Sequence, residues 1–203
     1  MQTVNQNFIA DLYNKALNVY HYGSLVYGTY IDGVSDRDYI VVVPNQMQDL
    51  DEQQFECDNC QFTVHTASSW QIMLDRCDVD AIECYFLPEQ FIAKETVVFI
   101  ADITKTKIRN SFSHVASNSF VKCKKKLEVE ESYDPHTGRK SLWHSLRIVD
   151  FGIQVLEHNS IVNYSSMNHL YDEIVKSEET DWEYFKTKYK PVYNALKTKF
   201  RNC

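Results

Sequence analysis

The sequence has few glycines, fewer basic than acidic residues, and no long apolar run. Only 5 of its 203 residues are glycine, against roughly 7% in average proteins. Its longest apolar runs are far below the roughly 18 residues that a membrane-spanning helix needs. Asp and Glu (28) outnumber Lys and Arg (21), for a net charge of −7. The chain therefore lacks a general attraction to nucleic-acid phosphates, although a local basic patch can still provide one.

The remaining composition is that of a globular protein. Apolar residues make up 44% of the chain and charged residues 24%, which excludes a disordered chain. The 13 Tyr, 11 Phe and 3 Trp residues supply large side chains for a core or for stacking. The first residues, Met1-Gln2-Thr3, do not begin a signal peptide. We expect a soluble protein with one core, or one domain with a helical extension.

Six cysteines in a chain of this length indicate reduced thiols rather than a disulfide framework. Cys57 and Cys60 have the spacing of half a zinc site, but no second pair of ligands follows at a suitable distance. Ordinary reduced cysteines are therefore expected, with structural zinc as the alternative.

Apolar spacing and turn residues predict an α+β fold. Unalternating apolar residues after Asp38, ended by Pro44, indicate a strand covered on both faces. The expected elements are a helix over 4–18, a strand over 19–22, a helical turn over 24–30, strands over 35–43, 61–65 and 81–87, and a helix over 66–76. Residues 45–60 predict a loop or an edge hairpin, and 133–138 a polar turn. We predict a mixed sheet with flanking helices over residues 1–90 and a helical part over 91–203.

Three of the five glycines, Gly23, Gly28 and Gly33, fall within eleven positions. Gly23-Ser24 follows a short predicted strand and opens a helical turn, where backbone N–H groups are available to a phosphate. Gly23 permits a close approach, and Ser24 adds a hydroxyl donor. The pair is therefore a candidate phosphate site.

Asp36 and Asp38 lie two apart at the start of the predicted buried strand. Side chains two apart on a strand point to the same face, with Cα atoms about 6.6 Å apart. Carboxylates that approach to about 4 Å repel by roughly 4 kcal/mol at an effective dielectric of 20. A divalent cation would offset this repulsion. The alternative is a solvated turn that Arg37 neutralises.

These residues also carry a resemblance to a known family. Gly23-Ser24-Leu-Val-Tyr27-Gly28-Thr29, followed by Ser35-Asp36-Arg-Asp38, resembles the signature of the DNA polymerase beta-type nucleotidyltransferase superfamily. The likeness is closer to its small predicted nucleotidyltransferases of bacteria and phages. Asp80 to Pro88 and Lys140-x-x-x-His144-x-x-Arg147 are similar to two further segments of that group. The resemblance covers about residues 19–160.

The resemblance implies a nucleotidyltransferase-type sheet and a transfer of a nucleoside monophosphate from a triphosphate, expected to be ATP, to an acceptor hydroxyl. Pyrophosphate would leave, and Mg²⁺ (or Mn²⁺) held by Asp36 and Asp38 would stabilise the attacking and leaving oxygens. The implied nucleotide-binding residues are Gly23, Ser24, Tyr27, Thr29, Lys140, His144 and Arg147. The acceptor stays open between a protein, an RNA end and a small molecule. No membrane partner is expected, and the implied location is the cytoplasm of a bacterium or a phage-infected host.

The third carboxylate of this superfamily is not evident here. By order it belongs on the strand over 61–65, which contains no acid. Asp58, just before that strand, is the candidate for a third catalytic residue beside Asp36 and Asp38, and Glu83 and His65 are candidates for the wall of the active site. The alternative is that the base is missing. The chain would then be a catalytically impaired nucleotide-binding module that acts as a sensor or a protein partner.

Several of these residues also have structural interpretations. Glu83 lies in an apolar segment and could form an ion pair with Arg37 or Arg147. Lys140, His144 and Arg147 share one stripe of a predicted helix, which is either a solvated face or a phosphate contact. The basic run over 122–126 is either a solvated helix edge or a site for an RNA end. The aromatic residues over 182–189 are expected to pack between helices.

Overall fold

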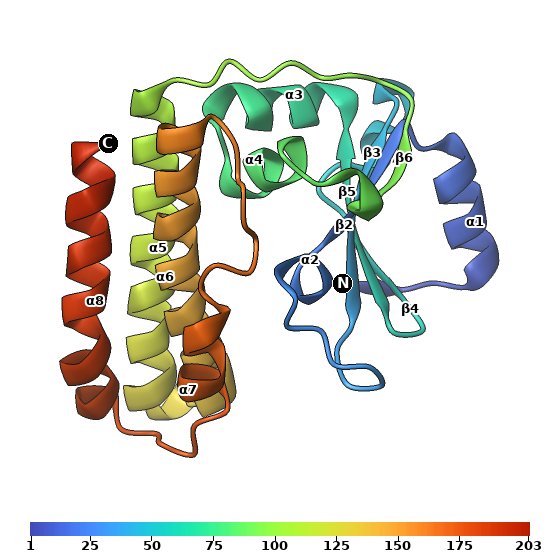
Figure 1. Ribbon diagram of the computed structural model, residues 1–203. Helices are drawn as coiled ribbons and strands as arrows, with labels where there is room; N and C mark the ends of the chain where they lie inside the picture. The colour runs from blue at the N-terminus through green and yellow to red at the C-terminus, as the bar shows by residue number, and fades with distance from the viewer. The chain divides into compact units, whose positions relative to one another are not determined.

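A computed structural model describes all 203 residues and divides them into two compact units, Met1–Ile103 and Thr104–Cys203 (Figure 1). The first unit contains a mixed sheet with helices, and the second is helical. The α+β class predicted from the sequence is confirmed. The predicted boundary at residue 90 precedes the last strand, whereas the compact units divide after Ile103.

The sheet of the first unit has six strands in the order β1-β4-β5-β3-β2-β6. Their bounds are β1 (Gln2–Thr3), β2 (Asn18–Tyr22), β3 (Arg37–Val43), β4 (Gln54–Cys57), β5 (Cys60–Thr66) and β6 (Ile92–Glu95). β3 runs antiparallel to β2 and parallel to β5. β4 and β5 form a hairpin. β4 lies within residues 45–60, for which the sequence predicted a loop or an edge hairpin, and β5 is the strand predicted over 61–65.

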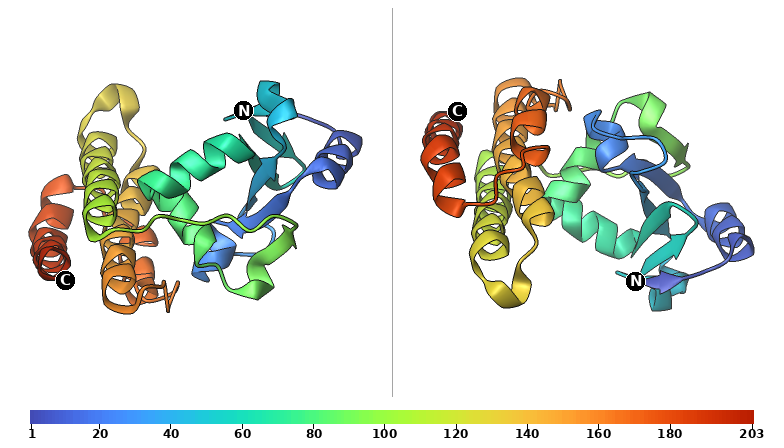
Figure 2. Two further views of the ribbon diagram at one scale, coloured as in Figure 1. Left: turned by 90° about the horizontal axis from the view of Figure 1, so that it is seen from above. Right: turned by 90° about the horizontal axis from the view of Figure 1, so that it is seen from below.

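Helices cover both faces of this sheet. They are α1 (Gln6–Lys15), α2 (Ser24–Tyr27), α3 (Ala67–Arg76) and α4 (Val79–Tyr85). Val41 and Val43 of β3 pack in one cluster with Leu12 of α1, whereas Tyr20, which pairs with Ile40, stacks on Trp70 of α3. Figure 2 shows α1 on one side of the sheet and α3 on the other. Both faces of β3 are therefore buried, as its unalternating sequence predicted.

The prediction of a strand over 81–87 is wrong, because this segment forms helix α4. Ala81, Ile82, Glu83 and Cys84 are all buried. A short helix buried on most sides shows the same continuous apolar run as a buried strand, so periodicity cannot distinguish the two. Pro88 follows the helix, which is also where a strand would have ended.

Strand β6 falls in a region that the sequence predicted to be mostly helical. It pairs antiparallel with β2 at one edge of the sheet. Its residues alternate between half-buried and exposed. The two exposed residues, Ala93 and Glu95, are of types that are uncommon in strands. The backbone pairing with β2 therefore decides the structure of this segment rather than local propensity.

The second unit consists of α5 (Lys105–Glu128), α6 (Pro135–His158), α7 (Tyr171–Val175) and α8 (Trp182–Asn202), with short 3₁₀ turns. α5, α6 and α8 lie side by side (Figure 2). The polar turn expected over 133–138 is only partly a turn, because Pro135 already occupies the first position of α6 and Asp134 caps it. Trp182, Phe185 and Tyr189 are buried, as expected for helix packing.

No helix of either unit has both the length and the apolarity needed to span a bilayer. No disulfide joins any of the six cysteines. Cys57 and Cys60 are free thiols that lie opposite each other in the register of the β4–β5 hairpin.

Candidate functional site

The turn at Gly23 and the carboxylate of Asp38 lie directly against each other. Tyr22 at the end of β2 pairs with Asp38 of β3, so the chain enters the Gly23-Ser24 turn beside this aspartate. A Cβ atom on Gly23 would lie 2.1 Å from Asp38 Oδ2. Gly23 also has φ +69°, a conformation that favours glycine. The predicted phosphate turn and the predicted acidic residue therefore form one site.

Ser24 begins the one-turn helix α2. The N–H groups of Val26 and Tyr27 donate back to Gly23 O, which leaves those of Ser24 and Leu25 in the first turn, where a helix offers no acceptor. Gly28 ends α2 in the left-handed conformation, and the N–H of Thr29 donates to Ser24 O at 2.9 Å. Gly28 and Thr29 thus fix the turn that presents Ser24.

Asp36 lies just before β3, and its carboxylate accepts a hydrogen bond of 2.8 Å from the side-chain amide of Gln61. Gln61 lies on β5 in register with Asp38. Parallel strands place residues in register on the same face of a sheet. Gln61 is therefore the side chain that β5 contributes beside the two aspartates. It was not among the site residues predicted from the sequence. Gln61 could have been recognised from its position, because it begins the predicted strand on which the third carboxylate was expected.

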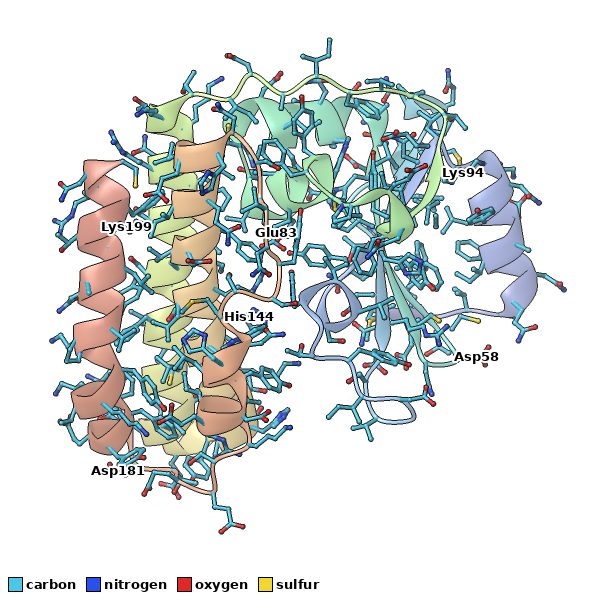
Figure 3. All side chains as sticks on the ribbon, in the orientation of Figure 1. Asp58, Glu83, Lys94, His144, Asp181 and Lys199 are labelled. Atoms are coloured by element: carbon cyan, nitrogen blue, oxygen red, sulfur yellow. The ribbon has the colours of Figure 1, made fainter.

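Asp58 occupies the turn of the β4–β5 hairpin (Figure 3). Its side chain is exposed and accepts a hydrogen bond of 3.0 Å from the amide of Gln6. The backbone at Asp58 has φ +51°, which the two-residue hairpin turn requires. The contacts of this aspartate are those of a turn residue next to α1.

Tyr27, expected at the nucleotide, is 2% exposed, and its hydroxyl donates to Glu83 at 2.6 Å. Glu83 comes from α4 and is fully buried (Figure 3). The two side chains thus join α2 to α4. Arg37, which the sequence offered as a partner of Glu83, is exposed and donates to the hydroxyl of Tyr30 instead.

His65, expected at the wall of the site, lies four residues beyond Gln61 along β5, a distance of about 13 Å. It is buried, and its ring lies 5.8 Å from that of Trp70. Burial lowers the pKa of His65. This histidine belongs to the core between β5 and α3.

Lys140, His144 and Arg147 lie on α6 of the second unit. Lys140 is exposed, whereas Arg147 is 3% exposed and lies over the ring of Phe151, 4.8 Å from its centre. Arg147 Nη2 lies 3.2 Å from His144 Nδ1. Because a guanidinium only donates, Nδ1 accepts and the neutral ring carries its proton on Nε2.

The surroundings of His144 are cationic. Burial lowers its pKa well below the ordinary value, and the charges of Arg147, Lys140 and Lys122 lower it further. Lys122 comes from the basic run of α5, so α5 and α6 together place these charges around one imidazole. Lys122 was noted in the sequence only as part of the basic run.

No cluster of three or more His, Cys, Asp or Glu side chains is spaced to hold a metal ion. Asp36 and Asp38 provide two carboxylates, with the carboxamide of Gln61 beside them. Proteins commonly bind Mg²⁺ through one or two carboxylates, with water and substrate phosphates as the remaining ligands. The residues present therefore fit a Mg²⁺ ion that binds together with a nucleotide.

No family model matches this sequence, and a search of curated proteins gave no match. Among solved structures, the chain is similar to a nucleotidyltransferase-like protein from Exiguobacterium sibiricum, at 10% identity and a TM-score of 0.31. The similarity covers 97% of this chain and 72% of that one. A similarity at this level decides neither family nor activity.

Proposed function

We propose that this protein is a nucleotidyltransferase, which moves a nucleoside monophosphate from a nucleoside triphosphate to an acceptor hydroxyl. The observation that carries the proposal is the contact between Gly23 and the Asp38 carboxylate. It brings a turn with available N–H groups against the carboxylate of Asp38, with Asp36 two residues earlier in the chain, and we call this place the Gly–Asp site. Polyphosphate and metal are neighbours in this reaction, and so are the residues that would bind them.

The roles follow from the chemistry of each group. The N–H groups at Ser24 and its hydroxyl would hold the β- and γ-phosphates. Asp36 and Asp38 would hold Mg²⁺, which supplies charge stabilisation at the phosphate oxygens when bound. The acceptor hydroxyl loses its proton to water and its oxygen forms a bond to the α-phosphorus. The bond between this phosphorus and the bridging oxygen breaks, so that pyrophosphate leaves. Holding the reactants in line would supply much of the rate.

Pyrophosphate release from each of the four nucleoside triphosphates, in the presence of Mg²⁺ and cell-derived acceptors, tests this proposal. Asp38→Asn keeps the size of the side chain but removes its charge, and we expect it to reduce release by about 100-fold or more. Asp32→Asn is the matched control, because Asp32 is exposed in the preceding turn. An equal effect of both substitutions, or no release from the unsubstituted protein, would contradict the proposal.

One observation favours a second function, that of a module that binds a nucleotide without turning it over. Gln61 lies beside Asp36 and Asp38, and its neutral amide cannot replace a carboxylate as a base or as a charged metal ligand. In this case the protein binds nucleotide with Mg²⁺ but releases no pyrophosphate.

Gln61→Glu separates the two functions. The substitution nearly preserves the size of the side chain and adds a third carboxylate on the same face of the sheet. If the module is correct, we expect the variant to bind Mg²⁺-nucleotide more tightly and to gain pyrophosphate release that the unsubstituted protein lacks. If the protein is instead an active nucleotidyltransferase, the unsubstituted protein already releases pyrophosphate. Calorimetry with ATP and Mg²⁺, run beside the release assay, gives both readings, and an absence of nucleotide binding would exclude both functions.

A further inference from the structure

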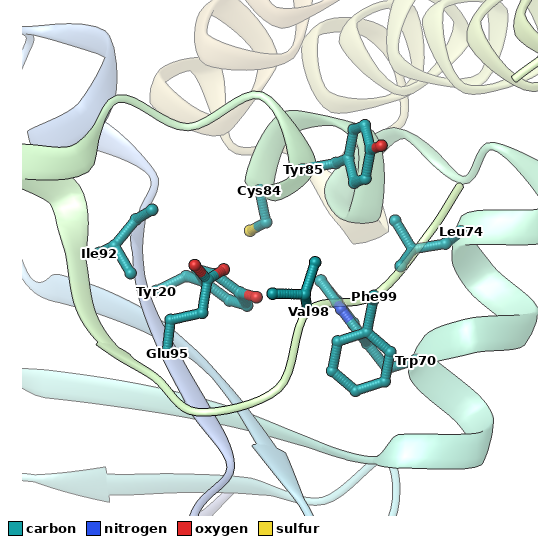
Figure 4. Close-up of a pocket in the computed structure, with 9 residues that line it drawn as sticks. All are labelled: Tyr20, Trp70, Leu74, Cys84, Tyr85, Ile92, Glu95, Val98 and Phe99. Atoms are coloured by element: carbon teal, nitrogen blue, oxygen red, sulfur yellow. The ribbon is translucent and has the colours of Figure 1, made fainter. Parts of the chain in front are cut away.

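A cavity of about 160 Å³ lies within the first unit, apart from the Gly–Asp site (Figure 4). Tyr20 of β2, Trp70 of α3 and Cys84 of α4 line it, and Glu95 of β6 and the following residues Val98 and Phe99 complete its wall. An apolar cavity of roughly 150 Å³ in another protein binds benzene. The space therefore fits one small organic molecule.

The cavity has a buried floor and an exposed mouth. Tyr20, Trp70 and Cys84 are 5%, 1% and 3% exposed. Glu95 is exposed, and Val98 is 82% exposed. A ligand can thus reach the aromatic floor directly from solvent.

The lining combines aromatic rings with a single negative charge. Four aromatic side chains line the cavity, and no Lys, Arg or His does. Burial raises the pKa of the Tyr20 hydroxyl and of the Cys84 thiol, so both groups are neutral near pH 7. The charge of the cavity therefore comes from Glu95, whose carboxylate is turned toward Tyr20 and Cys84 (Figure 4).

We propose that this cavity binds a small organic ammonium ion. The face of an aromatic ring attracts a cation electrostatically, and Glu95 supplies the counter-charge at the mouth. A divalent metal ion is not a suitable ligand, because Glu95 is the only carboxylate that lines the cavity. An uncharged ligand would gain nothing from the charge of Glu95, which acts on the Tyr20 hydroxyl in the cavity wall. The proposal is independent of nucleotidyl transfer.

Calorimetric titration with choline chloride tests the proposal, with 3,3-dimethyl-1-butanol as the uncharged probe of the same shape. We expect choline to bind and the alcohol to bind at least about tenfold more weakly, because only choline carries the charge that the rings and Glu95 attract. Equal binding of the two probes would identify an apolar cavity and overturn the proposal. Failure of choline to bind would overturn it as well.

Two variants of the full-length chain assign binding to this cavity. Glu95→Gln removes the charge at the mouth and is expected to weaken choline binding about tenfold. Glu89→Gln is the matched control, because Glu89 is also exposed but does not line the cavity. Unchanged binding in Glu95→Gln would place choline elsewhere and overturn the proposal. No residue of the Gly–Asp site lines the cavity, so that failure of the nucleotidyltransferase proposal leaves the choline result unaffected.

Discussion

At the scale of single residues, Gly23 is the glycine with the least room for a side chain. The space in which a side chain would begin is occupied by the carboxylate of Asp38. Gly33 provides a natural comparison, since it has a similar φ of +74° but no atom within 4 Å of the point where a Cβ would lie. The two glycines therefore separate the effect of backbone conformation from the effect of a close approach.

We expect Gly23→Ala to lower the free energy of unfolding by about 2–4 kcal/mol, because it adds a steric clash to the conformational strain. Gly33→Ala should lower it by only about 1–2 kcal/mol, from conformation alone. Urea denaturation measures both. Gly23→Ala should also weaken binding of Mg²⁺-ATP, since Asp38 must move. Equal destabilisation by the two substitutions would contradict the close approach.

His65 predicts how stability depends on pH. Its ring is buried, Nδ1 has no hydrogen-bond partner, and burial lowers its pKa. The unfolded state therefore takes up a proton near the ordinary pKa of about 6.5, whereas the folded state takes it up only at a lower pH. The free energy of unfolding should fall as the pH is lowered below this value, by at most about 1.4 kcal/mol per pH unit for this one group.

Urea denaturation at pH 7 and pH 5 checks this dependence. His65→Leu should lose less stability between the two pH values than the unsubstituted protein does, because it has no proton to take up at this position. His21 and His144 also have lowered pKa values, so part of the dependence should persist in the variant. An identical dependence in both proteins would show that His65 does not contribute.

At the scale of elements, the hydrogen bond between Tyr27 and Glu83 connects α2 to α4. Tyr27→Phe removes the donor and leaves the buried carboxylate with one hydrogen bond fewer. We expect a loss of about 1–3 kcal/mol in the free energy of unfolding. Tyr13→Phe is the control, because the hydroxyl of Tyr13 donates to Ala93 O at an exposed position, where water can replace it. Denaturation curves that coincide for the two variants would contradict the connecting role.

Most elements of the first unit could be predicted because their patterns are local. The predictions for α1, β2, β3, β5 and α3 are confirmed. α4 was mistaken for a strand because a helix buried on most sides loses its amphipathic period. β6 was missed because pairing with β2 stabilises it, and a distant partner leaves no trace in the local sequence.

At the scale of the whole molecule, charge is divided unevenly between the two units. Residues 1–103 contain 4 Lys and Arg against 16 Asp and Glu, a net charge of −12. Residues 104–203 contain 17 against 12, a net charge of +5. The net charge of −7 for the chain conceals this division. A triphosphate at the Gly–Asp site would enter the acidic unit, whose overall charge repels it.

Nucleotide binding should therefore depend on a divalent cation. We expect chelation of Mg²⁺ to weaken ATP binding by about 100-fold or more, because the polyphosphate would then face Asp36 and Asp38 without neutralisation. Adenosine, which carries no phosphate, is the control, and chelation should not change its binding. Calorimetry with and without chelator measures both, and ATP binding that is indifferent to chelation would place the nucleotide away from the two aspartates.

The sequence alone is enough for the features that depend on near neighbours in the chain: the glycine turn at Ser24, the place of Asp38 at the start of β3, and most helices and strands. Three features depend on long-range contacts and could not be predicted. Gln61 lies beside Asp36, the hydroxyl of Tyr27 donates a hydrogen bond to Glu83, and a cavity forms between Tyr20, Trp70 and Glu95. The physical reason is that periodicity and capping act within a few residues. Strand order and register instead depend on which distant segments bury one another's apolar faces.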